Sequence, residues 1–202
     1  MSTVPQKQFY KIEEYFALEQ ASSEKHEYYR GEIFLMAGAS IRHNRIARNL
    51  LTQLTLQLRG KPCEPFGSDL RIAVKTYPLH TYPDLSVICG GPVMDSIDRH
   101  AATNPHTLIE VLSPSTEKYD RGEKFTLCRS LASLREYILV AQNQPHLERF
   151  VLQSNDKWLL HIYDGLEAVV DLPDLGCRLT MSDIYEGVTF GELKLRQDDD
   201  EE

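Results

Sequence analysis

Apolar residues recur at helical spacing in one long stretch of the chain, residues 42–59. The positions that repeat every three or four residues are Ile46, Leu50, Leu51, Leu54 and Leu58. This spacing places them on one face and predicts an amphipathic helix. Gly60 and Pro62 follow directly and end the run. A shorter amphipathic pattern over residues 11–20 predicts a second, earlier helix.

Elsewhere the apolar residues come in short runs rich in Val, Ile and Leu, which turn residues separate. Such runs predict β-strands. The predicted strands are 67–75, 82–89, 107–112, 136–141, 147–153 and 157–163, with two more before residue 190. The stretch 28–37 also resembles a strand, with a turn at Arg30-Gly31 inside it or just before it.

A further helix is predicted from Asp120 to Leu131, because Asp120 supplies an N-cap acid and Glu123 follows three residues later. Helices packed against a sheet predict an α/β or α+β fold. The sheet is expected to be mixed, since short loops join many neighbouring strands. Neither a repeat nor a Gly/Ser linker divides the chain, so residues 1–192 are predicted to form one domain. The acidic residues 193–202 are predicted to be a disordered tail.

Composition places the chain among soluble globular proteins, with 42% apolar and 26% charged residues over its 202 positions. A membrane helix would need roughly 18 to 20 continuous apolar residues, and the sequence has no such stretch and no signal-like N-terminus. We therefore expect a cytoplasmic protein without a membrane partner. The four cysteines are far apart, and solitary buried thiols in a reducing compartment are expected: Cys63, Cys89, Cys128 and Cys177.

The net charge of −8 first argues against a nucleic-acid partner, but its distribution changes that interpretation. Five of the negative charges lie in residues 198–202, which leaves −3 for the rest of the chain. Residues 41–75 hold seven Lys and Arg against two acids. Arg42, Arg45 and Arg48 recur every three residues beside His43, on one side of the long helix. That side is either a solvated face or a surface for a phosphate backbone.

Two acids stand where strands are otherwise apolar. Glu110 lies in the middle of the run 107–112, and burying an ionised carboxylate without a partner is costly. It must face solvent, pair with a base or hold a metal. Asp84 begins the strand 84–89, where a turn acid is also common. If these two strands are antiparallel neighbours, both carboxylates lie at the same end of the sheet.

On the helix predicted from Asp120 to Leu131, Lys124 shares one face with three apolar residues, Leu127, Cys128 and Leu131. It therefore points toward the sheet, where it either snorkels to the edge or reaches a polar site. Two carboxylates and a lysine at one sheet edge suit a site for Mg²⁺. The ion would neutralise phosphate charge, and the lysine would orient the attacking water or stabilise the transition state.

Taken together, several short motifs in a fixed order carry a family resemblance over about residues 10–190. They are Glu27, Gly31-Glu32, His43, Tyr82-Pro83-Asp84, the run from Ile109 to Thr116, Asp120, Lys124 and Glu136-Tyr137. In this order the chain resembles the Uma2 family (DUF820) of restriction-endonuclease-like proteins. That family is similar to the PD-(D/E)xK nuclease superfamily, whose core is a mixed sheet flanked by helices.

The resemblance implies roles for individual residues. Pro83-Asp84 would be the PD pair, and Glu110-Val111-Leu112 would stand where (D/E)xK is expected, with Leu112 in place of the lysine. Lys124 would then supply the missing ammonium. Asp84, Glu110 and the carbonyl of Val111 would bind Mg²⁺ or Mn²⁺.

Three more residues are given supporting roles with alternatives. Glu27 or Glu32 would complete the metal shell, or either is a surface acid. His43 would contact phosphate or orient water, or it caps its helix.

The function that follows is a metal-dependent endodeoxyribonuclease, which hydrolyses phosphodiester bonds by one-step attack of water. DNA is the expected partner, and nucleases of this fold often act as homodimers. Because the lysine is displaced, a catalytically inactive nucleic-acid-binding or interaction protein that retains the fold is the main alternative. A metal-dependent hydrolase with another substrate is the third.

Overall fold

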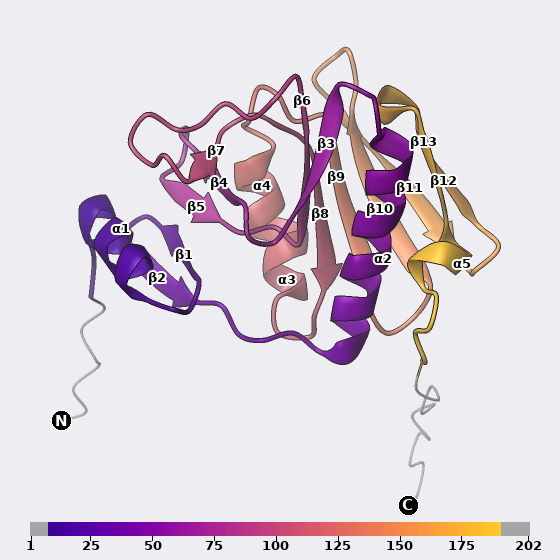
Figure 1. Cartoon of the computed structure of the whole chain (residues 1–202), viewed down its shortest axis with the longest axis horizontal. Helices are drawn as coiled ribbons and strands as arrows, with labels where there is room; N and C mark the ends of the chain where they lie inside the picture. Colours follow the sequence, from indigo (N-terminus) through magenta and orange to yellow (C-terminus); the bar gives the residue numbers. More distant parts are fainter. Residues whose placement is uncertain (1–7, 191–202) are drawn as a thin grey trace, which may run out of the picture.

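The computed structural model describes residues 8–190 and arranges them around two large β-sheets (Figure 1). The helical elements are α1 (Ile12–Ala21), α2 (Ile41–Leu58), α3 (Glu117–Tyr119), the π-helical turn η1 (Asp120–Lys124), α4 (Phe125–Cys128), the 3-10 turn η2 (Pro173–Leu175) and α5 (Met181–Ile184).

The strands are β1 (His26–Tyr29), β2 (Glu32–Leu35), β3 (Cys63–Gly67), β4 (Arg71–Val74), β5 (Leu79–Thr81), β6 (Leu85–Cys89), β7 (Ala101–Ala102), β8 (Pro105–Leu112), β9 (Glu136–Ala141), β10 (His146–Leu152), β11 (Trp158–Asp164), β12 (Val169–Leu172) and β13 (Cys177–Thr180).

Both large sheets are mixed, which confirms the predicted fold class. The six-stranded sheet has the order β11-β10-β9-β8-β6-β3, and β8 and β9 are its parallel pair. The five-stranded sheet has the order β2-β1-β5-β4-β7, in which β4 and β7 are parallel. A separate hairpin joins β12 and β13.

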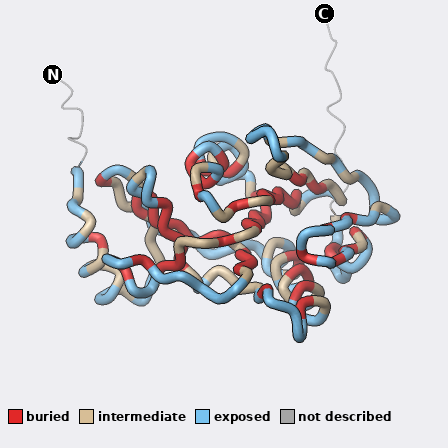
Figure 2. The backbone as a smooth tube through the Cα atoms, turned by 90° about the horizontal axis from the view of Figure 1, so that it is seen from above, coloured by how far each residue is buried: buried red, intermediate tan, exposed pale blue. Residues whose placement is uncertain are grey.

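The six-stranded sheet is buried on both faces, because alternate residues of β8 enter two different apolar clusters. Ile109 and Val111 pack with the apolar face of α2, whereas Leu108 and Leu112 pack with α4. Figure 1 shows β8 between these helices, and Figure 2 shows the buried residues concentrated along the central strands. By the same alternation, Glu110 lies on the α4 side of the sheet.

Two predicted strands differ from the structure. The stretch 28–37 contains a hairpin whose turn residues, Arg30 and Gly31, both have positive φ (48° and 90°), as a type I′ turn requires. The predicted strand 67–75 contains the end of β3, a turn at 68–70 and β4. β5 was not predicted.

The helix predicted from Asp120 to Leu131 begins and ends earlier in the structure than its sequence signals indicate. It starts at Glu117 and ends at Cys128, so the prediction of an N-cap at Asp120 was wrong. Ser113 makes the helix entry instead, since its hydroxyl accepts from Thr116 N (3.2 Å) and its carbonyl from Glu117 N (2.9 Å). The carboxylate of Asp120 is buried inside the fold.

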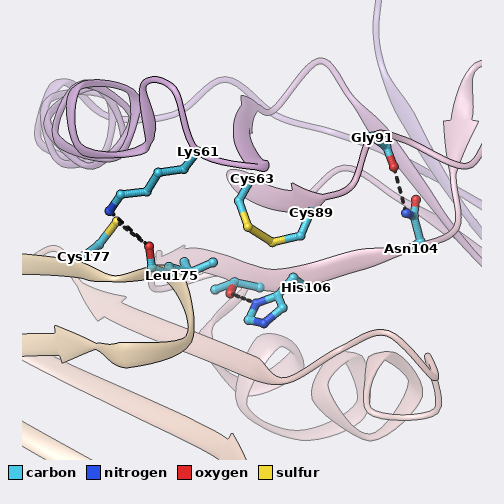
Figure 3. The surroundings of a disulfide bond; sticks show 9 residues. Lys61, Cys63, Cys89, Gly91, Asn104, His106, Leu175 and Cys177 are labelled. Atoms are coloured by element: carbon cyan, nitrogen blue, oxygen red, sulfur yellow. Dashed lines mark hydrogen bonds between the residues drawn. A yellow bond between two sulfur atoms is a disulfide. The ribbon is translucent and has the colours of Figure 1, made fainter.

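The expectation of four free thiols was also wrong. Cys63 and Cys89 lie directly opposite each other on the antiparallel strands β3 and β6 and form a disulfide (Figure 3). Residues 26 positions apart meet only through strand register, which the spacing of cysteines does not reveal. Cys128 and Cys177 are free and buried, as expected. The cysteine pattern therefore no longer supports an assignment to a reducing compartment.

Within residues 8–190, no helix is both long enough and apolar enough to span a bilayer. The predicted acidic tail, residues 193–202, lies outside the described residues.

Candidate active site

Asp84 and Glu110 face each other at the end of the β6–β8 pair. The strand register pairs Leu85 with Ile109, so the next two residues are opposite one another. The Asp84 carboxylate accepts a hydrogen bond from the backbone N–H of Val111 (2.7 Å), and the backbone N–H of Asp84 donates to Glu110 Oε2 (3.4 Å). The two carboxylates are thus at one sheet edge, the arrangement that antiparallel neighbours predict.

Lys124 reaches these acids from the helical segment that covers the sheet. Its Nζ lies 2.8 Å from Glu110 Oε1, 3.4 Å from Glu27 Oε1 and 3.7 Å from Asp120 Oδ1. The Lys124 side chain is buried, with 5% of its surface exposed. It ends the π-helical turn η1, a rare local geometry that is frequent at functional sites.

Glu27 brings the five-stranded sheet into the same cluster. Its carboxylate on β1 accepts hydrogen bonds from the Thr81 hydroxyl and from the backbone N–H of Tyr82 (3.2 Å), just before Asp84. Of the two acids predicted as alternatives, Glu27 is therefore the one in contact with Lys124. Glu32 lies on β2 opposite Tyr29, next to the hairpin turn.

His43 contacts the cluster from the first turn of α2. Its Nε2 lies 3.1 Å from Asp84 Oδ2. The N-cap of this helix is Ser40, whose hydroxyl accepts from the backbone N–H of His43 (3.1 Å). The alternative that His43 caps the helix was therefore wrong, and its side chain is turned to the acids.

Asp120 also belongs to the cluster, although its sequence context predicts a helix N-cap. A second signal was available, because Asp120 lies four residues before Lys124, which is the spacing of an ion pair on a helix. Burial raises the pKa of the Asp120 carboxyl, and Lys124 and a hydrogen bond from Thr116 oppose that rise.

Acids outnumber bases in this cluster, with four carboxylates around one ammonium. Burial raises the pKa of Glu110 well above its usual range, against the opposing charge of Lys124. Burial alone would lower the pKa of Lys124, but Glu110, Glu27 and Asp120 outweigh it and hold that pKa well above its usual value. Lys124 therefore acts as a cation, and the cluster is short of positive charge.

The available donors suit a hard cation. Asp84 is the most exposed of the site acids, with 20% of its side-chain surface accessible, and among the described residues its Oδ1 has no partner. Glu110 Oε1 is buried, and its contact with Lys124 is an ion pair without hydrogen-bond geometry. Within residues 8–190, no three or more His, Cys, Asp or Glu side chains are already placed to hold a metal ion together. Mg²⁺ needs only one or two carboxylates, with water completing its shell, so these residues fit it.

Leu112, which the family resemblance sets at the expected lysine position, is buried in the apolar cluster on the α4 side. Glu110 and Leu112 are two positions apart on β8, so their side chains lie on the same face of the sheet. Lys124 approaches that same face. An ammonium delivered from η1 therefore enters the same face of the sheet that a lysine at position 112 would have used.

The three helix arginines lie away from the cluster. At 100° per residue, each is at least about 100° around α2 from His43. Arg42 and Arg48 are exposed, whereas Arg45 donates a hydrogen bond to the carbonyl of Gly187 (2.8 Å). The three arginines and the acidic cluster thus lie on different sides of α2.

The chain is similar to several known proteins. A family model described as "Uma2: Putative restriction endonuclease" matches residues 12–182. The "Uncharacterized protein slr1290" of Synechocystis is 36% identical over 181 residues, covering 88% of this chain and 92% of that protein. The "Uncharacterized protein sll1609" of the same organism is 35% identical over 158 residues, covering 78% and 89%.

A solved structure is also similar. It is the crystal structure of "a putative nuclease belonging to DUF820" from Anabaena variabilis, with a TM-score of 0.67 over 81% of this chain and 91% of that chain. At 16% sequence identity, this likeness concerns the fold.

Proposed function

This chain belongs to the Uma2 family, as its motifs indicated, and from that membership we propose that it is a metal-dependent endonuclease that cleaves phosphodiester bonds in DNA. The observation that carries the proposal is the convergence of Asp84, Glu110 and Lys124 at one sheet edge, with 2.8 Å between the ammonium and the Glu110 carboxylate. A nuclease-like fold with this cluster suits hydrolysis.

Asp84 and Glu110 would hold the cation, with a carbonyl ligand from Val111. When bound, Mg²⁺ or Mn²⁺ supplies positive charge that neutralises phosphate oxygens and makes an attacking water more acidic. The N–H of Val111 and the imidazole of His43 fix the Asp84 carboxylate from two directions. Its exposed Oδ1 side is where a substrate would approach.

Lys124 would orient the attacking water and stabilise negative charge on the phosphate during the reaction. Its ammonium is positioned by Glu110, Glu27 and Asp120, so its orientation depends on both sheets and on η1. We propose that Glu27 acts on the site through Lys124, since Thr81 and Tyr82 already hold its carboxylate.

A nicking assay tests this proposal. Supercoiled and single-stranded DNA are incubated with Mg²⁺ or Mn²⁺ and with the native protein, Asp84→Asn or Glu110→Gln. We expect both variants to lose at least about 100-fold of the cleavage rate, by analogy with the loss of an electrostatic catalytic group. Glu167→Gln, which changes an exposed carboxylate remote from the cluster, is the matched control. Equal nicking by all four proteins would reject the site.

A second candidate is a nucleic-acid-binding or interaction protein that retains the fold without catalysis. The buried Leu112 at the usual lysine position favours it. This alternative predicts a gel shift with DNA and no cleavage under any divalent ion, and it predicts that Asp84→Asn leaves the gel shift unchanged.

We also propose that two copies associate through β11. This edge strand of the six-stranded sheet exposes apolar side chains, namely Leu159, Leu160 and Ile162, and exposed apolar edge strands tend to pair. Light scattering after size exclusion should give twice the 23.2 kDa chain mass, and Ile162→Lys should return it to the single-chain mass.

A further inference from the structure

We infer that Cys63 and Cys89 form a thiol–disulfide exchange site, which an anionic low-molecular-weight thiol such as glutathione reaches through the cavity beside Cys63. The inference rests on strand register, on the lining of that cavity and on the charges around it. It is independent of the proposed nuclease function.

The disulfide joins the weakest strand of the six-stranded sheet to its neighbour. β3 is an edge strand with β6 as its sheet partner, and Cys63 and Cys89 are directly opposite in that pair. β3 also contains Pro65, which has no N–H to donate, and Gly67. Proline and glycine both weaken a strand, and short edge segments open locally more readily than central ones.

A cavity of about 310 Å³ borders the Cys63 end of the bond. Its lining comes from the last turn of α2 and the start of β3, and it includes Arg59, Lys61, Cys63 and Glu64. Cys63 keeps 9% of its surface exposed, and Cys89 is half-buried. A small thiol therefore has space next to the sulfur of Cys63 once the edge strand opens slightly.

The cavity lining has two basic residues, Arg59 and Lys61, and one acid, Glu64, so its charges favour an anion. Lys61 is engaged, because its Nζ donates to the carbonyl of Gly176 (2.7 Å). The same Nζ lies 3.4 Å from the carbonyl of Leu175 (Figure 3). Arg59 is exposed, which leaves its guanidinium to meet a carboxylate of the incoming thiol. Glutathione carries such carboxylates, whereas 2-mercaptoethanol is uncharged.

The two remaining cysteines are unsuited to this chemistry. Cys128 is fully buried under α4, and burial raises the pKa of its thiol. Cys177 is buried beneath the loop that Lys61 holds. Because the thiolate is the reactive form, a buried thiol with a raised pKa exchanges slowly.

The exchange balances as two thiol steps. A glutathione thiolate forms a bond to Cys63 Sγ while the Cys63–Cys89 bond breaks, and the electron pair leaves with Cys89 Sγ, which takes a proton from water. A second glutathione thiolate then attacks the glutathione sulfur of the mixed disulfide and releases Cys63 as a thiolate, which also takes a proton from water. The protein disulfide has gained two electrons and two protons, and two glutathione molecules have become one glutathione disulfide.

Reduction leaves β3 attached to β6 through the backbone ladder alone. β6 runs from Cys89 back to the residue after Asp84, and the chain that precedes β3 is α2, which carries His43 at its other end. The disulfide therefore ties the start of β3, the strand that follows α2, to the end of β6, whereas the first turn of α2 and the residue before β6 meet through His43 and Asp84. We expect reduction to lower the melting temperature by about 5–10 °C, the range typical for loss of a disulfide in a chain of this size.

The decisive measurement is alkylation of the native, folded protein followed by peptide mass mapping. Before glutathione is added, we expect no alkylation of Cys63, Cys89 or Cys128. After incubation with about 10 mM reduced glutathione, Cys63 and Cys89 should both become alkylated while Cys128 stays protected. The Cys128→Ser variant should behave identically, and Cys63→Ser with Cys89→Ser should give no exchange.

Three results would overturn the inference. Alkylation of Cys63 before glutathione is added would show that the pair is not bonded. Absence of alkylation after glutathione would show an inert structural disulfide. Alkylation of Cys128 at the rate of Cys63 would show that whole-chain opening, and not the cavity, gives access.

A charge variant tests the class of thiol. Arg59→Gln should slow exchange with glutathione about two- to fivefold, the effect of losing one exposed charge pair, and should leave exchange with 2-mercaptoethanol unchanged. Arg129→Gln, another exposed arginine on a different element, should change neither rate. Equal effects of Arg59→Gln on both thiols would reject the anionic selectivity.

Discussion

Lys124 Nζ lies 2.8 Å from Glu110 Oε1, and each side chain keeps only 5% of its surface exposed. A buried ion pair of this kind is weak evidence for stability, since desolvation offsets its attraction. Here the ammonium also touches Glu27 and Asp120, so one cation compensates several acids. We therefore interpret this ion pair as the centre of the candidate active site and not as a stabilising contact.

Lys124→Met should lower the free energy of unfolding by about 3 kcal/mol, because it leaves buried carboxylates without their cation. Adding Glu110→Gln should recover part of that loss, since the nearest unpaired acid is removed. Urea denaturation of both single variants and the double variant measures the coupling. Lys118→Met, on the exposed side of α3, is the control and should change stability little. Simple additivity of the two single losses would contradict the pairing.

Mg²⁺ should stabilise the native protein, and it should not stabilise Asp84→Asn. At a concentration 100 times its dissociation constant, a ligand adds about 2.7 kcal/mol to the folded state. That corresponds to a rise of about 5–10 °C in melting temperature for a chain of this size. Differential scanning calorimetry with a Mg²⁺ series gives the shift. A rise of the same size in Asp84→Asn would place the ion elsewhere.

His43→Gln should reduce DNA cleavage by about 10- to 100-fold, as expected for a group that orients a metal ligand. Its Nε2 is 3.1 Å from Asp84 Oδ2, whereas the helix cap is made by Ser40 and persists in the variant. Melting temperature should therefore stay within about 2 °C of the native value. Cleavage rates and melting curves are measured together, with His161→Gln as control. Full activity in His43→Gln would remove the imidazole from the site.

The three arginines of α2 should differ in whether their loss affects DNA binding alone or also stability. Changing Arg42 and Arg48 to Gln should weaken DNA binding and reduce the salt dependence of log K by about 1.8, at about 0.9 per lost phosphate contact. The Arg42 change should leave stability unchanged because that side chain is exposed, whereas the Arg48 change should cost up to about 1 kcal/mol through the lost hydrogen bond to Asn49 Oδ1 (2.9 Å). Arg45→Gln should also cost about 1 kcal/mol of stability through its lost bond to Gly187. Fluorescence anisotropy at several salt concentrations measures the slopes, and an unchanged slope would exclude a phosphate contact.

His146 should make a pH-dependent contribution to stability. Burial, the largest single effect, lowers its pKa, but the hydrogen bonds and charges of Asp164 (2.6 Å) and Glu148 (3.0 Å) together outweigh it and raise the pKa. A raised folded-state pKa means that the stabilisation is complete below the unfolded value of about 6.5 and is lost as pH rises through the folded value.

The size of this contribution is small, at most about 1 kcal/mol, because Asp164 is 73% exposed and solvent screens the pair. The measurement is the difference in unfolding free energy between native protein and His146→Gln from pH 5 to pH 9. It should be largest at the acidic end and close to zero at the alkaline end. A difference that grows with pH would contradict the assignment.

Local pattern predicted much of the six-stranded sheet. The apolar runs at 107–112 and 136–141 predicted two strands, and the structure forms both and buries them. A charged residue inside such a run is conspicuous because a buried charge is costly. Asp84 and Lys124 were predicted from the same kind of conflict between a residue and its surroundings.

Long-range register accounts for what local pattern could not predict. Whether Cys63 meets Cys89 depends on which residues β3 and β6 align, and a shift by one position would turn the side chains to opposite faces. Asp120 was assigned to a helix cap because its local signal for a cap is strong. The spacing of four residues between Asp120 and Lys124 was the weaker signal, and the structure brings the two side chains together within η1.

The contact between Glu27 and Lys124 links the two large sheets across 97 positions of the chain. Contacts between such distant positions form late in folding, because the loop between them must close first. The complete acidic cluster therefore exists only after both sheets have docked. A chain still emerging from the ribosome, or one with its hairpin of β1 and β2 detached, has formed strands but lacks the contact that positions the Lys124 ammonium. Completion of folding would therefore be the step that assembles the proposed active site.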